Sequence, residues 1–164
     1  MSIRDYLRDH LVRFELMLHR PAPSAARMAE TVHVPGRTVA KGVLVRAGDA
    51  FALAVLPATH RIDLPRLAAL LGVRELLIAT EAEVMSIYVD CERGALPPFG
   101  RPYGLTSIVD ASLAAGSEIF FVANSRHEGV RMRFRDYEAL ETPLRGRFAT
   151  MISPRQKNPQ RRAG

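Results

Sequence analysis

The spacing of apolar residues changes along the chain between a helical and a strand-like period. Near the N-terminus, helical spacing predicts a first helix, and a short strand follows over 14–19. Ser24 is a suitable N-cap for a second helix, which reaches Val32 and ends at the sequence HVPGR. The first helix is predicted from apolar and ring side chains at positions 3, 6, 7, 10, 11 and 14.

Capping residues predict the helices that follow. Asp63 is placed to cap a helix that ends at Gly72, and Thr80 with Glu83 has the spacing of a capping box. A short helical turn is expected over 111–116 and a last helix near 136–140.

Strand-like segments lie between these helices. Residues 39–47 and 50–58 are predicted to be two strands, and Gly48-Asp49 between them is a hairpin signal. Further strands are expected over 105–110 and 117–124 and around 129–134. Clustered strands with inserted helices predict an α+β fold with a mixed sheet.

Length and charge suggest one domain and a basic tail. At 164 residues with 48% hydrophobic residues, the chain is expected to form a single domain over 1–152. The stretch 153–164 holds four cations and no acid, so it supplies four of the six net positive charges and is expected to be disordered. Such a tail can bind phosphates by charge or remain solvated without a partner.

Other composition features exclude several classes. The longest apolar run, 50–57, is too short to span a membrane, and the charged N-terminus is unlike a signal peptide, so we expect a cytoplasmic protein without a membrane partner. The single cysteine, Cys91, excludes an internal disulfide and has no zinc-ligand spacing around it. We therefore expect no metal and no cofactor.

Lys41 interrupts a row of valines in the first hairpin. On a strand it shares a face with Val39, Val43 and Val45, where a charge is costly unless an anion meets it. The small residues around it, Gly42 and the alanines at 50, 52 and 54, are expected to leave room for a ligand. The alternative is a lysine that lays its stem on the valines and its ammonium in water.

Two more candidates lie in the stretch FFVANSRHEGVRMRFR. His127, at a turn between strands, can exchange protons near neutral pH, although a lone histidine there is also an ordinary surface residue. Arg131, Arg133 and Arg135 fall on one face of the predicted strand. Such a stripe suits a nucleic-acid backbone or a solvated strand edge that discourages aggregation.

The sequence DCERGALPPFGRPYG, residues 90–104, gathers the cysteine with three glycines and three prolines. Proline fixes φ and glycine admits conformations that other residues refuse, so this loop is expected to be stiff and specially shaped. Cys91 is rejected as a nucleophile, because no histidine adjacent in sequence would activate it.

Several of these segments, in this order, resemble the YbaK-like aminoacyl-tRNA editing family, which is related to the insertion domain of bacterial prolyl-tRNA synthetases. The resemblance runs from about Ala25 to Leu140 and rests on a collinear set of motifs: KGVLVR, AVLP, DLPRL with LG, ATEAE, GALPPFG, IVDASL and SRHE. It implies a mixed, mostly antiparallel sheet curled toward a barrel with helices around it. It also implies hydrolysis of the ester that joins a wrong amino acid to the 3′ end of tRNA, without metal.

The resemblance assigns residues to roles. Lys41 and His127 match functionally important positions of the family, and Asp110 matches a position that we interpret as structural. The family often has threonine where Gly42 stands and glycine where Asn124 stands. The residues that match the aminoacyl pocket are Gly94, Ala95, Leu96, Pro97 and Pro98, with Ser125 in the late turn.

We therefore predict a trans-editing deacylase with aminoacyl-tRNA as its partner and a synthetase as a possible second partner. Backbone groups of the Gly94 loop would bind the aminoacyl group, while a cation, water and the ribose hydroxyl assist hydrolysis. Two alternatives stay open. The chain can be a tRNA-binding relative without catalysis, or a module that binds another protein through a sheet edge.

Overall fold

The computed structural model describes residues 1–21 and 25–152, which form helices around three sheets. The largest sheet has the order β5 (Leu77–Ile78), β2 (Ala40–Ala47), β3 (Ala50–Pro57), β6 (Thr106–Asp110) and β9 (Leu144–Gly146). A second sheet has the order β1 (Glu15–Leu18), β8 (Ser125–Arg133) and β7 (Glu118–Ala123). The third pairs β10 (Ala149–Met151) with β4 (His60–Ile62).

The described residues form six α-helices and two short 3₁₀ helices. The α-helices are α1 (Ile3–Asp9), α2 (Ala25–Val32), α3 (Leu64–Leu71), α4 (Glu81–Ile87), α5 (Ala111–Ala114) and α6 (Phe134–Glu141). The 3₁₀ helices are η1 (Gly36–Thr38) and η2 (Arg101–Tyr103). The α+β class predicted from the sequence is therefore confirmed.

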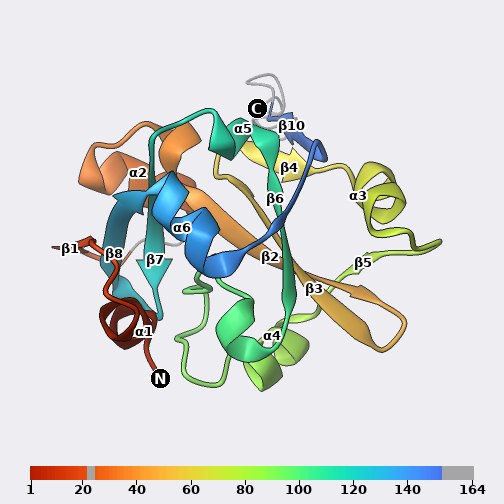
Figure 1. Cartoon of the computed structure of the whole chain (residues 1–164), viewed down its shortest axis with the longest axis horizontal. Helices are drawn as coiled ribbons and strands as arrows, with labels where there is room; N and C mark the ends of the chain where they lie inside the picture. The colour runs from red at the N-terminus through yellow and green to blue at the C-terminus, as the bar shows by residue number, and fades with distance from the viewer. Residues whose placement is uncertain (22–24, 153–164) are drawn as a thin grey trace, which may run out of the picture.

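The β2–β3 hairpin organises the largest sheet. Its strands pair antiparallel from Ala47 opposite Ala50 to Ala40 opposite Pro57, and Gly48 at the turn has a φ of 60°. β6 adds parallel to β3, and β9 adds parallel to β6, while the other strand pairs are antiparallel. Figure 1 shows α3 and β5 on one side of the hairpin, and β7, β8 and α1 on the other.

Each face of the largest sheet is covered by apolar side chains. One face packs against the three-stranded sheet, where Leu53 and Val55 meet Phe121 and Val130 in a cluster that also buries Tyr88, Phe99 and Tyr137. The opposite face packs Val45, Ala54 and Leu56 beneath Leu67 of α3 and Phe148. The alanines on this face of β3 were expected to leave room for a ligand. They instead allow Leu67 and Phe148 to pack closely on the sheet.

No sheet in the described part of the chain closes or curls into a barrel, so that prediction is wrong. The three-stranded sheet approaches β2 through a single parallel bridge between Val39 and Phe120. Farther along β2, β5 pairs only with Val45 and Arg46. The two sheets thus stack through their side chains, since their backbones join at only one position.

Most predicted caps are confirmed. The Asp63 side chain accepts from the N–H of Arg66, and Gly72 ends α3 with a φ of 69°. Thr80 and Glu83 form the expected capping box of α4. The Ser24 cap and the tail at 153–164 lie outside the described residues.

Several boundaries differ from the sequence pattern. β8 begins at Ser125, so His127 lies on a strand and not in the predicted turn. The first helix ends at Asp9, because Leu11 turns left-handed with a φ of 56° and lies 91% exposed. Arg135, predicted on a strand, lies in the first turn of α6, because β8 ends at Arg133.

Asp110 holds the end of β6 in place. Its buried carboxylate accepts from the N–H groups of Phe148 and Ala149 at 2.9 Å each, and from both donors of Ser112. Burial alone would raise the pKa of this carboxyl, but these hydrogen bonds lower it. The geometry agrees with the structural interpretation of Asp110.

Candidate active site

A cavity of about 380 Å³ opens between β2, α2, α4 and the loop that follows α4. Its apolar wall includes Met28, Val84, Met85 and Leu96, which come from three different elements. Its charged lining residues are Lys41, Glu81, Arg93 and Arg126. A cavity with an apolar wall and an excess of cations suits a ligand with a small apolar group and an anionic part.

Lys41 lies on β2 where that strand lacks an outer neighbour. The outer edge of β2 meets Phe120 at Val39 and β5 at Val45, and Lys41 lies between these two contacts. Burial lowers the pKa of the half-buried Lys41 ammonium, which finds no hydrogen-bond or ion-pair partner among residues 1–21 and 25–152. It is the one lysine in the described part of the chain. The free edge therefore presents an unpaired cation to the cavity.

The loop after α4 is packed directly on Gly42. A Cβ built at Gly42 would lie 3.2 Å from the carbonyl oxygen of Pro97 and 3.1 Å from Cδ1 of Leu53. The space beside Gly42, which was expected to admit a ligand, is thus filled mainly by the loop. This contact places Leu96 in the cavity wall.

Gly94 forms part of the cavity rim and has a φ of 81°. A Cβ there would meet Cδ of Arg126 at 3.9 Å, so the space is open and the backbone conformation is what calls for glycine. Arg126 comes from the start of β8 and lines the same cavity. Of the five predicted loop residues, Gly94 and Leu96 line the cavity.

The other three loop residues anchor the loop in the protein. Ala95, Pro97 and Pro98 are buried, and the N–H of Ala95 donates to the carbonyl of Glu92. The carbonyl of Pro98 accepts from the hydroxyl of Tyr137 at 2.9 Å. These contacts fix the side of the loop that faces away from the cavity lining.

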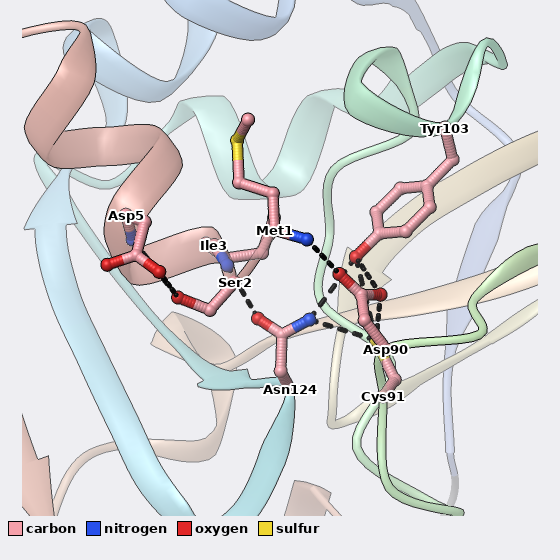
Figure 2. A network of polar contacts seen from close by, with 8 residues as sticks. All are labelled: Met1, Ser2, Ile3, Asp5, Asp90, Cys91, Tyr103 and Asn124. Carbon is pink, nitrogen blue, oxygen red and sulfur yellow. Dashed lines mark hydrogen bonds and ion pairs between the residues drawn. The ribbon is translucent and has the colours of Figure 1, made fainter.

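A polar network fastens the start of the loop to the N-terminal helix (Figure 2). The buried Asn124 side chain accepts from the N–H of Ile3 at 2.6 Å and donates to Sγ of Cys91 at 3.1 Å and to the hydroxyl of Tyr103 at 3.2 Å. Its backbone carbonyl accepts from the N–H of Glu92 at 2.8 Å. Asn124 thus joins α1, β7 and the loop.

Asn124 also has a φ of 63°, the left-handed conformation that glycine or asparagine adopts most readily. It lies next to a register shift between β7 and β8. The turn can therefore keep a glycine-like backbone shape while its side chain makes three hydrogen bonds.

Cys91 is part of this network and is buried. Burial raises the pKa of its thiol to about 11, and the neighbouring carboxylate of Asp90 adds to the effect. A thiol with that pKa is protonated at neutral pH and is a poor nucleophile. The described residues contain no group of three or more histidines, cysteines and acids able to hold a metal ion.

Comparison with known proteins assigns the family. Residues 19–140 match the aminoacyl-tRNA editing domain. The chain belongs to this family. No curated protein matches the sequence. The resemblance drawn from the motifs is thereby confirmed.

Solved structures share the editing-domain fold. A hypothetical protein, APE2540, superposes with a TM-score of 0.82 at 15% identity, covering 90% of this chain and 99% of that one. A candidate trans-editing enzyme for prolyl-tRNA synthetase gives 0.77 at 19% identity, with coverage of 90% and 94%. A candidate signal transduction protein from Marinobacter aquaeolei VT8 gives 0.71 at 17% identity, covering 90% of this chain and 30% of that one. At these identities the likeness concerns the fold.

Two predicted residues of the editing domain lie apart from the cavity lining. His127 is exposed on β8, and its carbonyl accepts from the N–H of His19. The hydroxyl of Ser125 accepts from the N–H of His127 at 3.2 Å. Arg126, between these two residues, is the one of the three that reaches the cavity.

The arginine stripe is divided between two environments. Arg131 lies opposite Glu15 on β1 and forms an ion pair with it at 3.7 Å. Arg133 and Arg135 instead line a second hollow, together with His10 and Arg13. We call the hollow lined by these four residues the basic groove.

Sequence reasoning missed part of the cavity. The apolar contributions of α2 and α4, from Met28, Val84 and Met85, were not among the predicted site residues. Glu81 and Arg93 were not predicted as site residues either. The one sequence signal for Arg93 is that it directly precedes Gly94, a predicted site residue.

The described residues contain no helix that is both long and apolar enough to cross a lipid bilayer.

Proposed function

We propose that this editing domain hydrolyses the ester bond between a wrong amino acid and the 3′ end of tRNA, and that it acts in trans. Family membership supports editing, and the structural relative that is a candidate trans-editing enzyme supports action in trans. The observation that carries the proposal is the unpaired, half-buried Lys41 at a cavity whose wall is otherwise mostly apolar.

The cavity suits the two ends of such a substrate. The amino-acid side chain would contact the apolar wall formed by Met28, Val84, Met85 and Leu96. The terminal phosphodiester or the ester carbonyl would pair with Lys41, which offsets the cost of keeping that cation half-buried. Backbone groups near Gly94 would approach the aminoacyl group closely.

The reaction needs no covalent intermediate with the protein. A water oxygen attacks the ester carbonyl carbon, the bond from that carbon to the ribose oxygen breaks, and a proton moves from water to the ribose oxygen. The products are the free amino acid and tRNA with its terminal hydroxyl. Lys41 would stabilise the negative charge that develops on the carbonyl oxygen, and the ribose hydroxyl would assist the proton transfer.

The basic groove is the proposed contact for the tRNA backbone. Arg13 and Arg133 have no ion-pair partner in the described part of the chain, and Arg135 has only the long contact of 4.0 Å to its neighbour Asp136. Arg126 at the cavity and Arg133 at the groove are seven residues apart on β8, about 24 Å along a strand. Phosphates leaving the cavity along this strand would meet the groove.

A deacylation screen tests the proposal. Purified protein is mixed with a panel of correctly and wrongly charged tRNAs, and the release of free amino acid is measured. We expect faster release from at least one misacylated tRNA than without protein. Salt-sensitive tRNA binding without release would identify a non-catalytic binder, and absence of both would favour a protein-interaction module.

A further inference from the structure

Glu81 is the single carboxylate among the described residues that line the cavity. It is the first residue of α4. Its Oε1 lies 2.8 Å from Nε of Arg93, the residue before Gly94. This ion pair therefore links α4 to the loop at the cavity rim.

The ion pair is well placed to open. Its side chains are 57% and 74% exposed, and ion pairs at such positions contribute little stability. A ligand that offers each charge a new partner would separate them at small cost. Such a ligand carries one cation and one anion, a short distance apart.

An aminoacyl ester at the end of a nucleic acid has this combination, with an α-ammonium group next to the ester and a phosphodiester on the neighbouring nucleotide. We propose that Glu81 binds the α-ammonium group and that Arg93, once released, binds the phosphodiester. This inference rests on the proposed function and adds a subsite to it. It makes the protein selective for free aminoacyl esters over N-acylated ones such as peptidyl-tRNA.

The charges around the cavity favour this assignment. Lys41 and Arg126 both line it, and either would repel an ammonium group. Without a carboxylate, the substrate ammonium would lie near these cations without a partner. Glu81 is the side chain that removes this penalty.

Binding of two stable analogues tests the subsite independently of hydrolysis. One is 3′-deoxyadenosine-5′-phosphate bearing an alanyl group through a 3′ amide, and the other carries a lactyl group, whose hydroxyl replaces the ammonium. We expect the wild-type protein to bind the alanyl analogue at least about tenfold more tightly, measured by NMR titration. In Glu81→Gln this preference should fall to about one.

Glu83→Gln is the matched control. Glu83 lies on the same helix but outside the cavity lining, and glutamine can keep its capping box with Thr80. It should retain the wild-type preference for the alanyl analogue. A wild-type preference near one, or a preference that survives in Glu81→Gln, would overturn the subsite. If the preference is found but no misacylated tRNA is hydrolysed, the subsite stands and the proposed function fails.

Discussion

Gly42 lies directly beneath the carbonyl oxygen of Pro97, and a Cβ there would stand 3.2 Å from that oxygen. This contact connects the strand that carries Lys41 to the loop that carries Gly94. The relative position of the cation and the rim of the cavity therefore depends on a residue without a side chain. It also gives a physical reason why this chain has glycine where the family often has threonine.

We predict that Gly42→Ala displaces the loop and lowers deacylation at least about tenfold. The added methyl would press on both Pro97 and Leu53, and overpacking of this kind costs roughly 1–3 kcal/mol, partly offset by the better strand propensity of alanine. Hydrogen exchange over 90–98 and single-turnover deacylation measure the two effects. Gly116→Ala is the control, because its Cβ would have ordinary contacts of 3.6 Å or more. A wild-type rate with an unchanged loop would show that the contact is unimportant.

We predict that Asn124→Gly destabilises the protein although glycine tolerates the backbone conformation. The substitution leaves the N–H of Ile3 without its acceptor and removes the amide donor to Cys91 and Tyr103, at a cost of roughly 1–3 kcal/mol. Asn124→Ala should cost about 1 kcal/mol more, because alanine disfavours a positive φ. Urea unfolding gives the order of the three proteins, and exchange of the Ile3 amide reports the loss of the anchor. Equal stability of all three would mean that the network is dispensable.

We predict that Cys91 is unreactive in the folded protein. Its buried thiol, with a pKa raised to about 11, should react with Ellman's reagent at pH 7 at least about a hundredfold more slowly than in urea. The folded state holds the thiol proton more tightly than the unfolded state. The contribution of Cys91 to stability is therefore present below the ordinary pKa of 9.0 and is lost as the pH rises toward 11. Fast labelling of native protein would contradict the burial, and Cys91→Ser should keep deacylation within a fewfold of wild type.

We predict that Arg131 and Arg133, which the sequence placed on one face of a strand, contribute unequally to tRNA binding. Arg133→Ala should weaken binding and reduce the slope of log K against log salt by about 0.7–0.9, the loss expected for one phosphate contact. Arg131→Ala should change the slope less, because Arg131 is already paired with Glu15. Fluorescence anisotropy of labelled tRNA at several salt concentrations gives the slope for each variant. Equal slopes for both variants would argue against the basic groove.

The sequence predicted those parts of the fold that local chemistry determines. Caps at Asp63 and Thr80 and the turn at Gly48 depend on neighbours within a few residues, and each was confirmed. The N-terminal helix was overestimated, since the pattern through Leu11 does not show where the backbone turns. Whether sheets stack or close depends on which strand edges meet, and hydrophobic spacing carries no such information.

Part of the cavity lining could be predicted where an unusual residue type marked it. Lys41 among valines and Gly94 in a proline-rich loop both line the cavity. His127 was predicted from the family resemblance; its side chain is exposed on β8, and its neighbour Arg126 lines the cavity. The roles of Glu81 and Arg93 could not be seen in the sequence, because their significance lies in a contact between α4 and the loop.

Lys41→Ala, measured for both stability and single-turnover deacylation on one preparation, tests the central claim most directly. Because burial lowers the pKa of the ammonium, the charged form destabilises the folded protein at neutral pH, and this destabilisation is lost as the pH rises through the lowered pKa toward the ordinary value of 10.5. We therefore expect Lys41→Ala to be as stable as wild type or slightly more so. We expect its deacylation rate to fall at least about a hundredfold, roughly 2.7 kcal/mol, and Lys41→Arg to restore it only in part. An unfolded variant, or one that hydrolyses the best substrate at the wild-type rate, would contradict the assignment of Lys41 to the active site.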